Sequence, residues 1–264
     1  MINLEEKSKW LRRLVLEKTI STNGKCHIGS TFSCIELLVA LYYGGILRFN
    51  PKEPKYIDRD IFVLGKGHVC YALYNILADL GFFKFSFLDE YGKQGGDIGV
   101  QLNRNTPGIE YNTGSIGNAI GICAGIALSA KIDNRNIRSV ALIGDGECQE
   151  GSVWESISFA GTYKLSNLIV IVDRNRLGAT EFIEDSGNLR DKVIANNWEC
   201  VEINGHSFEE ILNALDYIGK NKLPYMIIAN TVKGRGVSFM ENNKKWHNSM
   251  LNEEEIKIAR FELL

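Results

Sequence analysis

Short apolar runs alternate with stretches of helical periodicity along most of this chain, and this alternation restricts the fold more than any other feature. The clearest run is Leu168-Ile169-Val170-Ile171-Val172. A strand that is apolar at every position must be covered on both faces, which is typical of a parallel sheet between layers of helices. The other runs that we interpret as strands are 61–64, 140–143, 200–203 and 225–229.

The sequence therefore predicts an α/β fold, in which a mostly parallel sheet carries helices on both faces. No repeat, low-complexity segment or linker interrupts the 264 residues, so we expect one domain covering residues 1–264. The polar, glycine-rich stretch 92–108 is predicted to be a long loop. The predicted helices are 4–20, 35–43, a segment that follows His68 and ends at about Leu80, 115–131, 152–163, 189–196 and 208–218.

Two serines carry signals of a helix start. Ser33, with Glu36 three residues later, is typical of an N-cap, so we expect Ser33 to cap the helix 35–43. Ser115 is predicted to open the helix that ends near residue 131. Both predictions rest on local sequence alone.

Three glycines, Gly117, Gly121 and Gly125, are spaced four residues apart in the predicted helix 115–131. This spacing places them on one helix face, where the absence of side chains lets another backbone approach closely. Two interpretations stay open: tight packing against a second helix, or close approach to a cofactor at the start of the helix.

The composition is that of an ordinary globular protein, with 45% hydrophobic residues and a formal net charge of −2. This charge gives no reason to expect binding to nucleic acid or to an anionic membrane. We expect no secretory signal, and no stretch approaches the about 18 apolar residues of a membrane span. The six cysteines form no C-x-x-C pair, so reduced thiols in a cytoplasmic protein are the simplest interpretation.

Polar groups follow two neighbouring predicted strands. Gly144-Asp145-Gly146-Glu147 comes after the strand 140–143, and Asp173-Arg174-Asn175-Arg176-Leu177 comes after the strand 168–172. The carboxyl ends of parallel strands meet at one edge of a sheet, where ligands bind. The Asp145 carboxylate, the Asn175 amide and the Leu177 carbonyl are oxygen ligands that suit Mg²⁺, and phosphate can complete the shell. A G-D-G triplet alone is a common turn, but its pairing with the later asparagine is far more specific.

Here the sequence resembles the thiamine diphosphate fold and, within it, the transketolase family. The G-D-G triplet and the asparagine about 30 residues later form the diphosphate signature of that fold. The resemblance covers nearly the whole chain, and the motifs keep the family's order. The segments that match the family are Gly24–Gly29, Asp60–His68, Gly108–Gly117, Gln149–Gly151, Leu165–Asn175, Lys233–Val237 and Trp246-His247.

The resemblance implies thiamine diphosphate as a cofactor, together with Mg²⁺ or another divalent cation such as Ca²⁺ or Mn²⁺. It implies that His68 and His247 hydrogen-bond the diphosphate and that His27 lies at the substrate mouth, so these three histidines are the candidate catalytic residues. His206 is interpreted as structural. The other cofactor-binding residues that it implies are Gly114, Ile116, Gly144, Gly146, Glu147, Glu150 and Asn175, with Asp145, Asn175 and Leu177 as metal ligands.

The assignments of Glu150, Gly114 and Ile116 rest on the resemblance, and for Glu150 an alternative stays open. Glu150 resembles a family glutamate that helps to hold the two halves of the active site together, but it also suits a solvated acid at a helix N-terminus. Gly114 and Ile116 match positions that line the aminopyrimidine ring, which only the resemblance assigns.

The chain departs from the family in length and at one position. Full transketolases are more than twice as long, so we expect a C-terminal partner subunit of about 300 residues, in an α₂β₂ assembly with the active site at the subunit boundary. Gln101 falls where the family has a substrate-contacting histidine, and it keeps hydrogen bonding without the titratable proton. With His27 and His247, it is a candidate contact for a sugar or sugar phosphate substrate.

The resemblance therefore implies an enzyme that transfers a two-carbon ketol unit from a ketose phosphate to an aldose. Two alternatives within the cofactor class are the α subunit of a 2-oxo acid dehydrogenase and a deoxyxylulose-phosphate synthase. The first would lack the early histidine segments and the late Trp-His, and the second is normally one long chain. A third alternative is a cofactor-binding subunit without catalytic activity, which a neighbouring reading frame for the C-terminal half would argue against.

Overall fold

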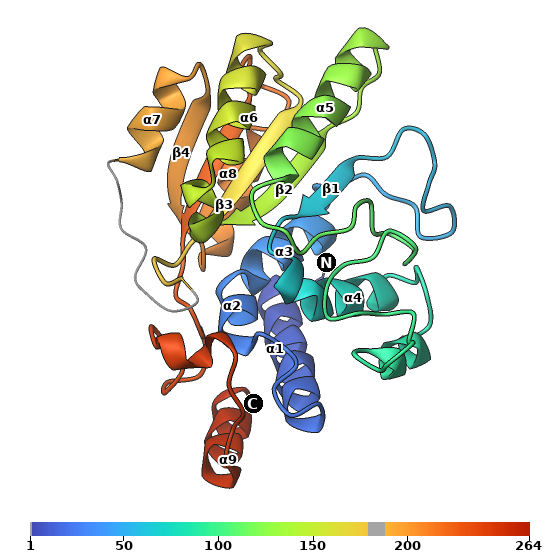
Figure 1. Ribbon diagram of the computed structural model, residues 1–264, viewed down its shortest axis with the longest axis vertical. Helices are drawn as coiled ribbons and strands as arrows, with labels where there is room; N and C mark the ends of the chain where they lie inside the picture. The colour runs from blue at the N-terminus through green and yellow to red at the C-terminus, as the bar shows by residue number, and fades with distance from the viewer. Residues whose placement is uncertain (1, 179–187) are drawn as a thin grey trace.

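A five-stranded parallel sheet forms the centre of the computed structural model, which describes residues 2–178 and 188–264. The strand order is β1-β2-β3-β5-β4, and every neighbouring pair is parallel. All five predicted strands are present, and the predicted fold class is confirmed (Figure 1). The strands are β1 (Ile61–Leu64), β2 (Ser139–Gly144), β3 (Leu168–Arg174), β4 (Glu199–Asn204) and β5 (Tyr225–Asn230).

Helices cover both faces of the sheet, and the side chains of successive strand residues point to opposite faces. In β3, Ile169 and Ile171 join one buried cluster, while Val170 and Val172 join the other. This double burial explains why the strand is apolar at each of these positions. The layer on the first face contains α1 (Leu4–Ser21), α2 (Ile28–Ser33), α3 (Ile35–Tyr43), α4 (Cys70–Asp79) and α8 (Phe208–Asp216), and the layer on the second contains α5 (Ala119–Ile132), α6 (Gly151–Thr162) and α7 (Leu189–Ala195). The last helix, α9 (Glu253–Glu262), packs against α1 and lies away from the sheet (Figure 1).

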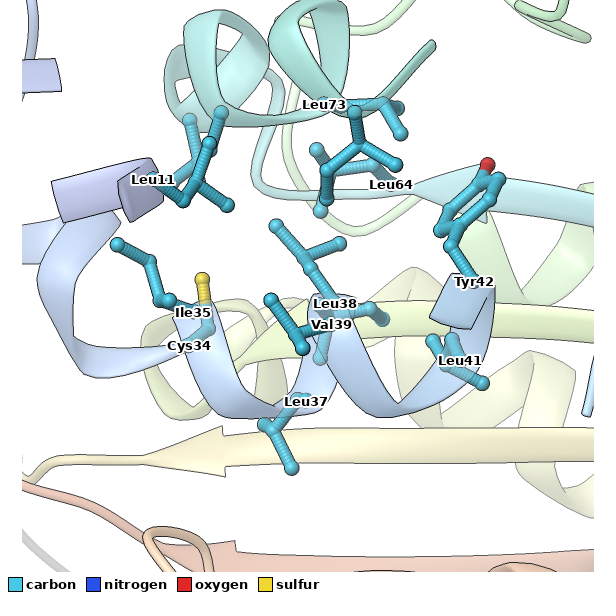
Figure 2. Packing of buried hydrophobic residues seen from close by; sticks show 14 of the residues in the cluster. Leu11, Cys34, Ile35, Leu37, Leu38, Val39, Leu41, Tyr42, Leu64 and Leu73 are labelled. Carbon is cyan, nitrogen blue, oxygen red and sulfur yellow. The ribbon is translucent and has the colours of Figure 1, made fainter. Parts of the chain in front are cut away.

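The helix α3 lies inside the first layer and is nearly devoid of exposed side chains. Figure 2 shows it between the sheet, toward which Leu37 points, and the residues Leu11 of α1 and Leu73 of α4. Apart from Glu36, which pairs with Arg12, this helix is apolar on all sides and therefore has to be buried. Its burial anchors α2, the preceding helix, which carries residues of the site described below.

Two predicted helix starts were wrong. Ser33 is the last residue of α2 and Cys34 precedes α3, because the Ser33 hydroxyl donates to Asp173 at 2.5 Å instead of capping a helix. The second helix, α5, begins at Ala119 and not at Ser115. Gly117 lies outside it with φ of +86°, a conformation that interrupts a helix but that glycine adopts readily.

Close packing against a second helix, which the glycine spacing predicted, does not apply to every glycine of this set. A Cβ atom at Gly121 would lie 2.9 Å from the hydroxyl oxygen of Ser156 in α6, so this glycine permits close helix packing. A Cβ atom at Gly125 would meet no atom of the described chain within 4 Å. Tight packing against a neighbouring helix thus applies to Gly121 and not to Gly125.

The pattern missed α2 and α9, and four short 3₁₀ helices complete the fold of the described residues. These are Gly67–Val69, Phe85–Glu90, Asp145–Gln149 and Lys244–His247. In the described part of the chain, none of the helices has the length and apolar character that a membrane span requires. None of the six cysteines forms a disulfide.

Candidate functional site

A cavity of about 220 Å³ opens at the carboxyl ends of β1, β2 and β3. The register pairs Gly144 at the end of β2 with Asp173 near the end of β3, so the two predicted metal-binding segments lie side by side. The structure therefore brings together residues that are far apart in the sequence. The predicted site residues that line this cavity are His68, Ile116, Gly144, Asp145, Gly146, Glu147, Asn175, Leu177 and His247.

Asp145 is 7% exposed and begins the short helix that follows β2. Its carboxylate accepts hydrogen bonds from the backbone N–H groups of Gly146, at 2.9 Å, and Arg176. Burial and then repulsion from Asp173 raise the pKa of Asp145 to about 6. A negative charge is therefore costly at this position unless a cation approaches it.

Asn175 and Leu177 complete the predicted set of oxygen ligands. The Asn175 Oδ1 atom accepts from the backbone N–H of Leu177 at 3.0 Å, which turns this segment toward the cavity. The Leu177 carbonyl accepts from the Lys233 ammonium at 3.1 Å and retains a second lone pair. Among the described residues, no three His, Cys, Asp or Glu side chains group to hold a metal ion. A cation here would depend on one carboxylate, amide and backbone oxygens, and phosphate, which suits Mg²⁺.

Three histidines from distant segments surround one point beside the cavity. The ring centroids lie 5.1 Å apart for His27 and His68, 5.4 Å for His27 and His247, and 5.6 Å for His68 and His247. Burial first, and then nearby lysines, lower the pKa of all three, to about 4 for His247. Neutral imidazoles can both donate and accept hydrogen bonds, which allows them to bind a ligand and to relay a proton.

Close backbone packing brings His247 to this point. A Cβ atom at Gly29 would lie 2.5 Å from the Trp246 carbonyl oxygen, so only glycine lets α2 approach the segment Lys244–His247. The His247 Nδ1 atom then lies 3.2 Å from the Ser30 hydroxyl and 3.0 Å from the Lys233 ammonium. The Nδ1 atom of His27 is buried and has no hydrogen-bond partner within the described residues.

The two predicted glutamates differ in their surroundings. Glu147 is 4% exposed, and its carboxylate accepts from the backbone N–H groups of Gly117 at 3.1 Å and Gly144 at 2.9 Å. It ties the loop before α5 to the G-D-G turn, and burial raises its pKa. Glu150 is exposed at the N-terminus of α6 and makes no side-chain cap. Its position fits both interpretations that the sequence left open.

Gln101 lies beside the cavity without lining it. Its Oε1 atom and the Thr113 hydroxyl are buried and lack hydrogen-bond partners within the described residues. Both atoms lie against Gly67, where a Cβ atom would approach them to 2.5 and 2.6 Å. Gly114 is next to them and has φ of +148°. Unpartnered buried polar atoms are rare, so a ligand or water is expected to bond to this pair.

Two buried lysines belong to the site, although the sequence interpretation gave them no role. Lys66, 4% exposed, forms an ion pair with Asp173 and donates to the Ser30 carbonyl at 3.0 Å. Lys233 is fully buried, and burial and then the charge of Lys66 lower its pKa to about 8. Both residues lie in segments that match the family, Asp60–His68 and Lys233–Val237, and this match is the signal that could have identified them.

These observations test whether a magnesium diphosphate group fits the cavity. The ammonium groups of Lys66 and Lys233 provide positive charge for phosphate oxygens. A bound cation would offset the unfavourable free energy of burying the charged Asp145 carboxylate. A Cβ atom at Gly144 would project to 3.6 Å from the Lys66 side chain, so glycine keeps this wall of the cavity open. The donor set, charge and space all fit the group.

His206 lies away from this cavity and supports the structural interpretation. Its Nδ1 atom is 3.1 Å from Glu36, and its Nε2 atom accepts from the backbone N–H of Val232 at 2.8 Å. Glu36 in turn pairs with Arg12 at 2.7 Å. Both ring nitrogens are therefore occupied by contacts that hold the chain after β5 onto α3.

Comparison with known proteins decides the family. The family described as "Transketolase, thiamine diphosphate binding domain" matches residues 5–263. The chain belongs to the transketolase family. This confirms the resemblance that the sequence motifs indicated, and the match identifies the fold as a thiamine diphosphate binding domain.

Relatives of similar length are subunits and not whole transketolases. The chain is 39% identical to a subunit of apulose-4-phosphate transketolase from Phocaeicola vulgatus, over 88% of this chain and 84% of that protein. It is 37% identical to a 6-deoxy-6-sulfo-D-fructose transketolase subunit of a Clostridium species, over 99% of this chain and 96% of that protein.

Solved transketolases share the fold but are longer. The crystal structure of transketolase from Campylobacter jejuni superposes with a TM-score of 0.93 at 30% identity. The superposition covers 99% of this chain and 43% of that chain. This chain therefore corresponds to less than half of such a transketolase.

Proposed function

We propose that this chain is the cofactor-binding subunit of a two-subunit transketolase, which transfers a two-carbon ketol unit from a ketose phosphate to an aldose acceptor. The observation that carries the proposal is the cavity in which Asp145, Asn175 and the histidines gather, in a chain of the transketolase family. Relatives that match this chain over most of their length are named as transketolase subunits, which supports the same assignment.

In this proposal Asp145, Asn175 and the Leu177 carbonyl hold Mg²⁺, or Ca²⁺ or Mn²⁺ in its place. His68, Gly146 and His247 bind the diphosphate, and Lys233 adds positive charge beside them. Bound thiamine diphosphate supplies the electron-sink chemistry of ketol transfer. The protein contributes position and charge, because the site is largely buried and electrostatic interactions are strong there.

The three histidines are proposed to act on the substrate and on protons. The Nδ1 atom of His27 is buried and has no hydrogen-bond partner among the residues that the structure describes, so it can bond to a substrate hydroxyl group. Burial and the nearby lysines lower the pKa values of these rings, so the rings are neutral at pH 7 and each can donate one hydrogen bond and accept another. Gly114, Ile116 and Glu147 line or support the rest of the cofactor site, and Glu150 faces outward, where a partner can reach it.

The proposed partner is a C-terminal transketolase subunit of about 300 residues in an α₂β₂ assembly, with residues 1–264 as a single domain on this side. The comparison supports a partner, because this chain corresponds to 43% of a solved transketolase. A cytoplasmic location is part of the same proposal and agrees with six cysteines that form no disulfide.

Calorimetric titration with thiamine diphosphate tests the proposed cofactor site. We expect binding that depends on Mg²⁺, because the Asp145 carboxylate would otherwise repel the diphosphate. The titration is made with and without the partner subunit, since the partner can complete the site. Equal binding with and without Mg²⁺, or no binding in either preparation, would contradict the proposal.

Gln101 is proposed to select the donor sugar. The buried Oε1 atom lacks a donor within the described residues, so it favours a substrate hydroxyl that can reach the hollow next to Gly67. Replacing Gln101 by His is expected to change the ratio of kcat/KM values between two ketose donors by about tenfold, as one hydrogen bond does. The measurement compares donors in the reconstituted enzyme, with Gln94→His, at an exposed glutamine outside the segments that match the family, as the control. An unchanged donor ratio would remove Gln101 from the substrate site.

A further inference from the structure

A second cavity, of about 520 Å³, lies at the carboxyl ends of β3, β4 and β5. It shares Asn175 and Leu177 with the cofactor cavity, and the rest of its lining comes from other segments. Its volume is in the range of sites for small metabolites. None of the functions described above uses this space.

The topology of the sheet explains why a crevice forms here. After β3 the chain continues to α7, whose Val193 packs in the cluster on the second face. After β5 the chain continues to Val237 and Met240, which pack in the cluster on the first face. The strands β3 and β5 are neighbours whose connections leave to opposite faces. Crevices at such switch points are the usual ligand sites of parallel sheets.

The charge of this cavity favours an anion. Arg174 and Arg176 line it, and no aspartate or glutamate is among the described residues of its lining. Arg174 forms a long ion pair with Glu202, at 3.5 Å. Arg176 is exposed and has φ of +62°, a left-handed conformation that costs energy in a residue with a side chain.

Amide groups surround the two arginines. Arg174 and Asn204 are both in register with Asn230, so the three side chains end adjacent strands at one level. The Oδ1 atom of Asn230 is buried and lacks a hydrogen-bond partner within the described residues. A buried acceptor of this kind requires a donor, such as the hydroxyl group of a ligand.

We propose that this second cavity binds a small phosphorylated polyol, with its phosphate on Arg176 and a hydroxyl group donating to Asn230. Arginine matches phosphate oxygens in geometry and charge. The residues proposed to bind this ligand, Arg176 and Asn230, do not line the cofactor cavity, so the proposal does not depend on the proposed transketolase activity.

The second site is coupled to the first through one short segment. Arg176 lies between the predicted metal ligands Asn175 and Leu177, and its backbone N–H donates to Asp145. A ligand that fixes Arg176 therefore also fixes the segment that faces the cofactor. We expect the phosphorylated polyol to change the affinity for thiamine diphosphate, and the cofactor to change the affinity for the polyol by the same factor.

Titration of glycerol 3-phosphate into the chain, compared with inorganic phosphate, tests the proposal. Arg176→Gln is expected to weaken binding of glycerol 3-phosphate about tenfold or more, the usual effect of losing a charge-assisted hydrogen bond. His68→Ala changes only the wall of the first cavity and should leave this binding intact. Arg104→Gln, at an exposed arginine outside both cavities, is the matched control for charge.

The comparison of ligands tests the polyol. Wild type should bind glycerol 3-phosphate more tightly than inorganic phosphate, and Asn230→Leu should remove this preference. Loss of binding in His68→Ala but not in Arg176→Gln would place the ligand in the cofactor cavity and overturn the proposal. Equal weakening by Arg176→Gln and Arg104→Gln, or no binding by wild type, would also overturn it. The proposed function is tested separately by the titration with thiamine diphosphate, so none of these three outcomes would decide it.

Discussion

Replacing Asp145 by Asn is expected to raise the free energy of unfolding of the cofactor-free chain by about 2 kcal/mol at neutral pH, with loss of Mg²⁺-dependent cofactor binding. The Asp145 carboxylate is buried and faces repulsion from Asp173, which raises its pKa from 3.8 to about 6. Asn carries no charge, but the N–H groups of Gly146 and Arg176 bond to different carboxylate oxygens, and the single oxygen of Asn can accept from only one of them. The lost hydrogen bond, about 1 kcal/mol, reduces the gain of about 3 kcal/mol that the pKa shift implies to about 2 kcal/mol. A residue whose loss stabilises the protein is typical of a site built for a ligand.

The pH dependence follows from the direction of the shift. The folded chain holds the Asp145 proton more tightly than the unfolded chain, so its stabilising contribution is present below pH 3.8 and is lost as the pH rises through about 6. The gain from Asn should therefore be small below about pH 4 and should reach its full size above about pH 6. Urea unfolding across this range measures it.

Asp133→Asn is the matched control, because this aspartate is exposed at the end of α5. Its free energy of unfolding should change by less than about 0.5 kcal/mol. A less stable Asp145→Asn variant at neutral pH would show that the carboxylate is structural. Unchanged Mg²⁺-dependent binding would remove Asp145 from the metal site.

Replacing Asp173 by Ala is expected to lower the free energy of unfolding by about 3 to 5 kcal/mol. Asp173 is fully buried and accepts hydrogen bonds from Lys66, Ser33 and Thr231. It joins the ends of β1, β3 and β5 to α2, directly beneath the cofactor cavity. Without it, the Lys66 ammonium would remain buried with no countercharge, which is the main cause of the loss.

A double variant separates the ion pair from packing. Lys66→Met with Asp173→Leu replaces both charges by apolar side chains and should be less destabilised than Asp173→Ala alone. The exposed pair of Asp216 and Lys220 is the control, and Asp216→Ala should cost less than about 1 kcal/mol. If the double variant is as unstable as the single one, the charge of Lys66 does not explain the loss.

The sequence predicted the sheet because β1, β2, β3 and β5 are buried on both faces and each carries an apolar run, and because the partly exposed edge strand β4 still carries the run 200–203. It failed where a tertiary contact overrode a local signal. Ser33 has the sequence context of a cap, but its hydroxyl is taken by Asp173, which is 140 residues away. Gly117 fits a helical spacing, but its N–H is held by Glu147 in another loop. The helix α9 was missed because its sequence is largely charged and its only buried residue is Ala259.

The site, like the fold, could be predicted only in part from the sequence. Asp145 and Asn175 could be placed together because the parallel arrangement brings strand ends to one edge. Lys66 and Lys233 could not be derived in this way, because a lysine in a sequence is normally expected at the surface. Their burial depends on Asp173, Leu177 and the chain after β5, which only the folded structure brings together.

The most direct test of the central claim is a ketol transfer assay on this chain alone, on a partner subunit that corresponds to the rest of a full-length transketolase, and on their mixture. We expect activity only in the mixture, with thiamine diphosphate and Mg²⁺ present. Full activity of this chain alone would contradict the claim that it is one subunit of a two-subunit enzyme. A mixture that forms a complex and binds the cofactor but transfers no ketol unit would contradict the proposed reaction.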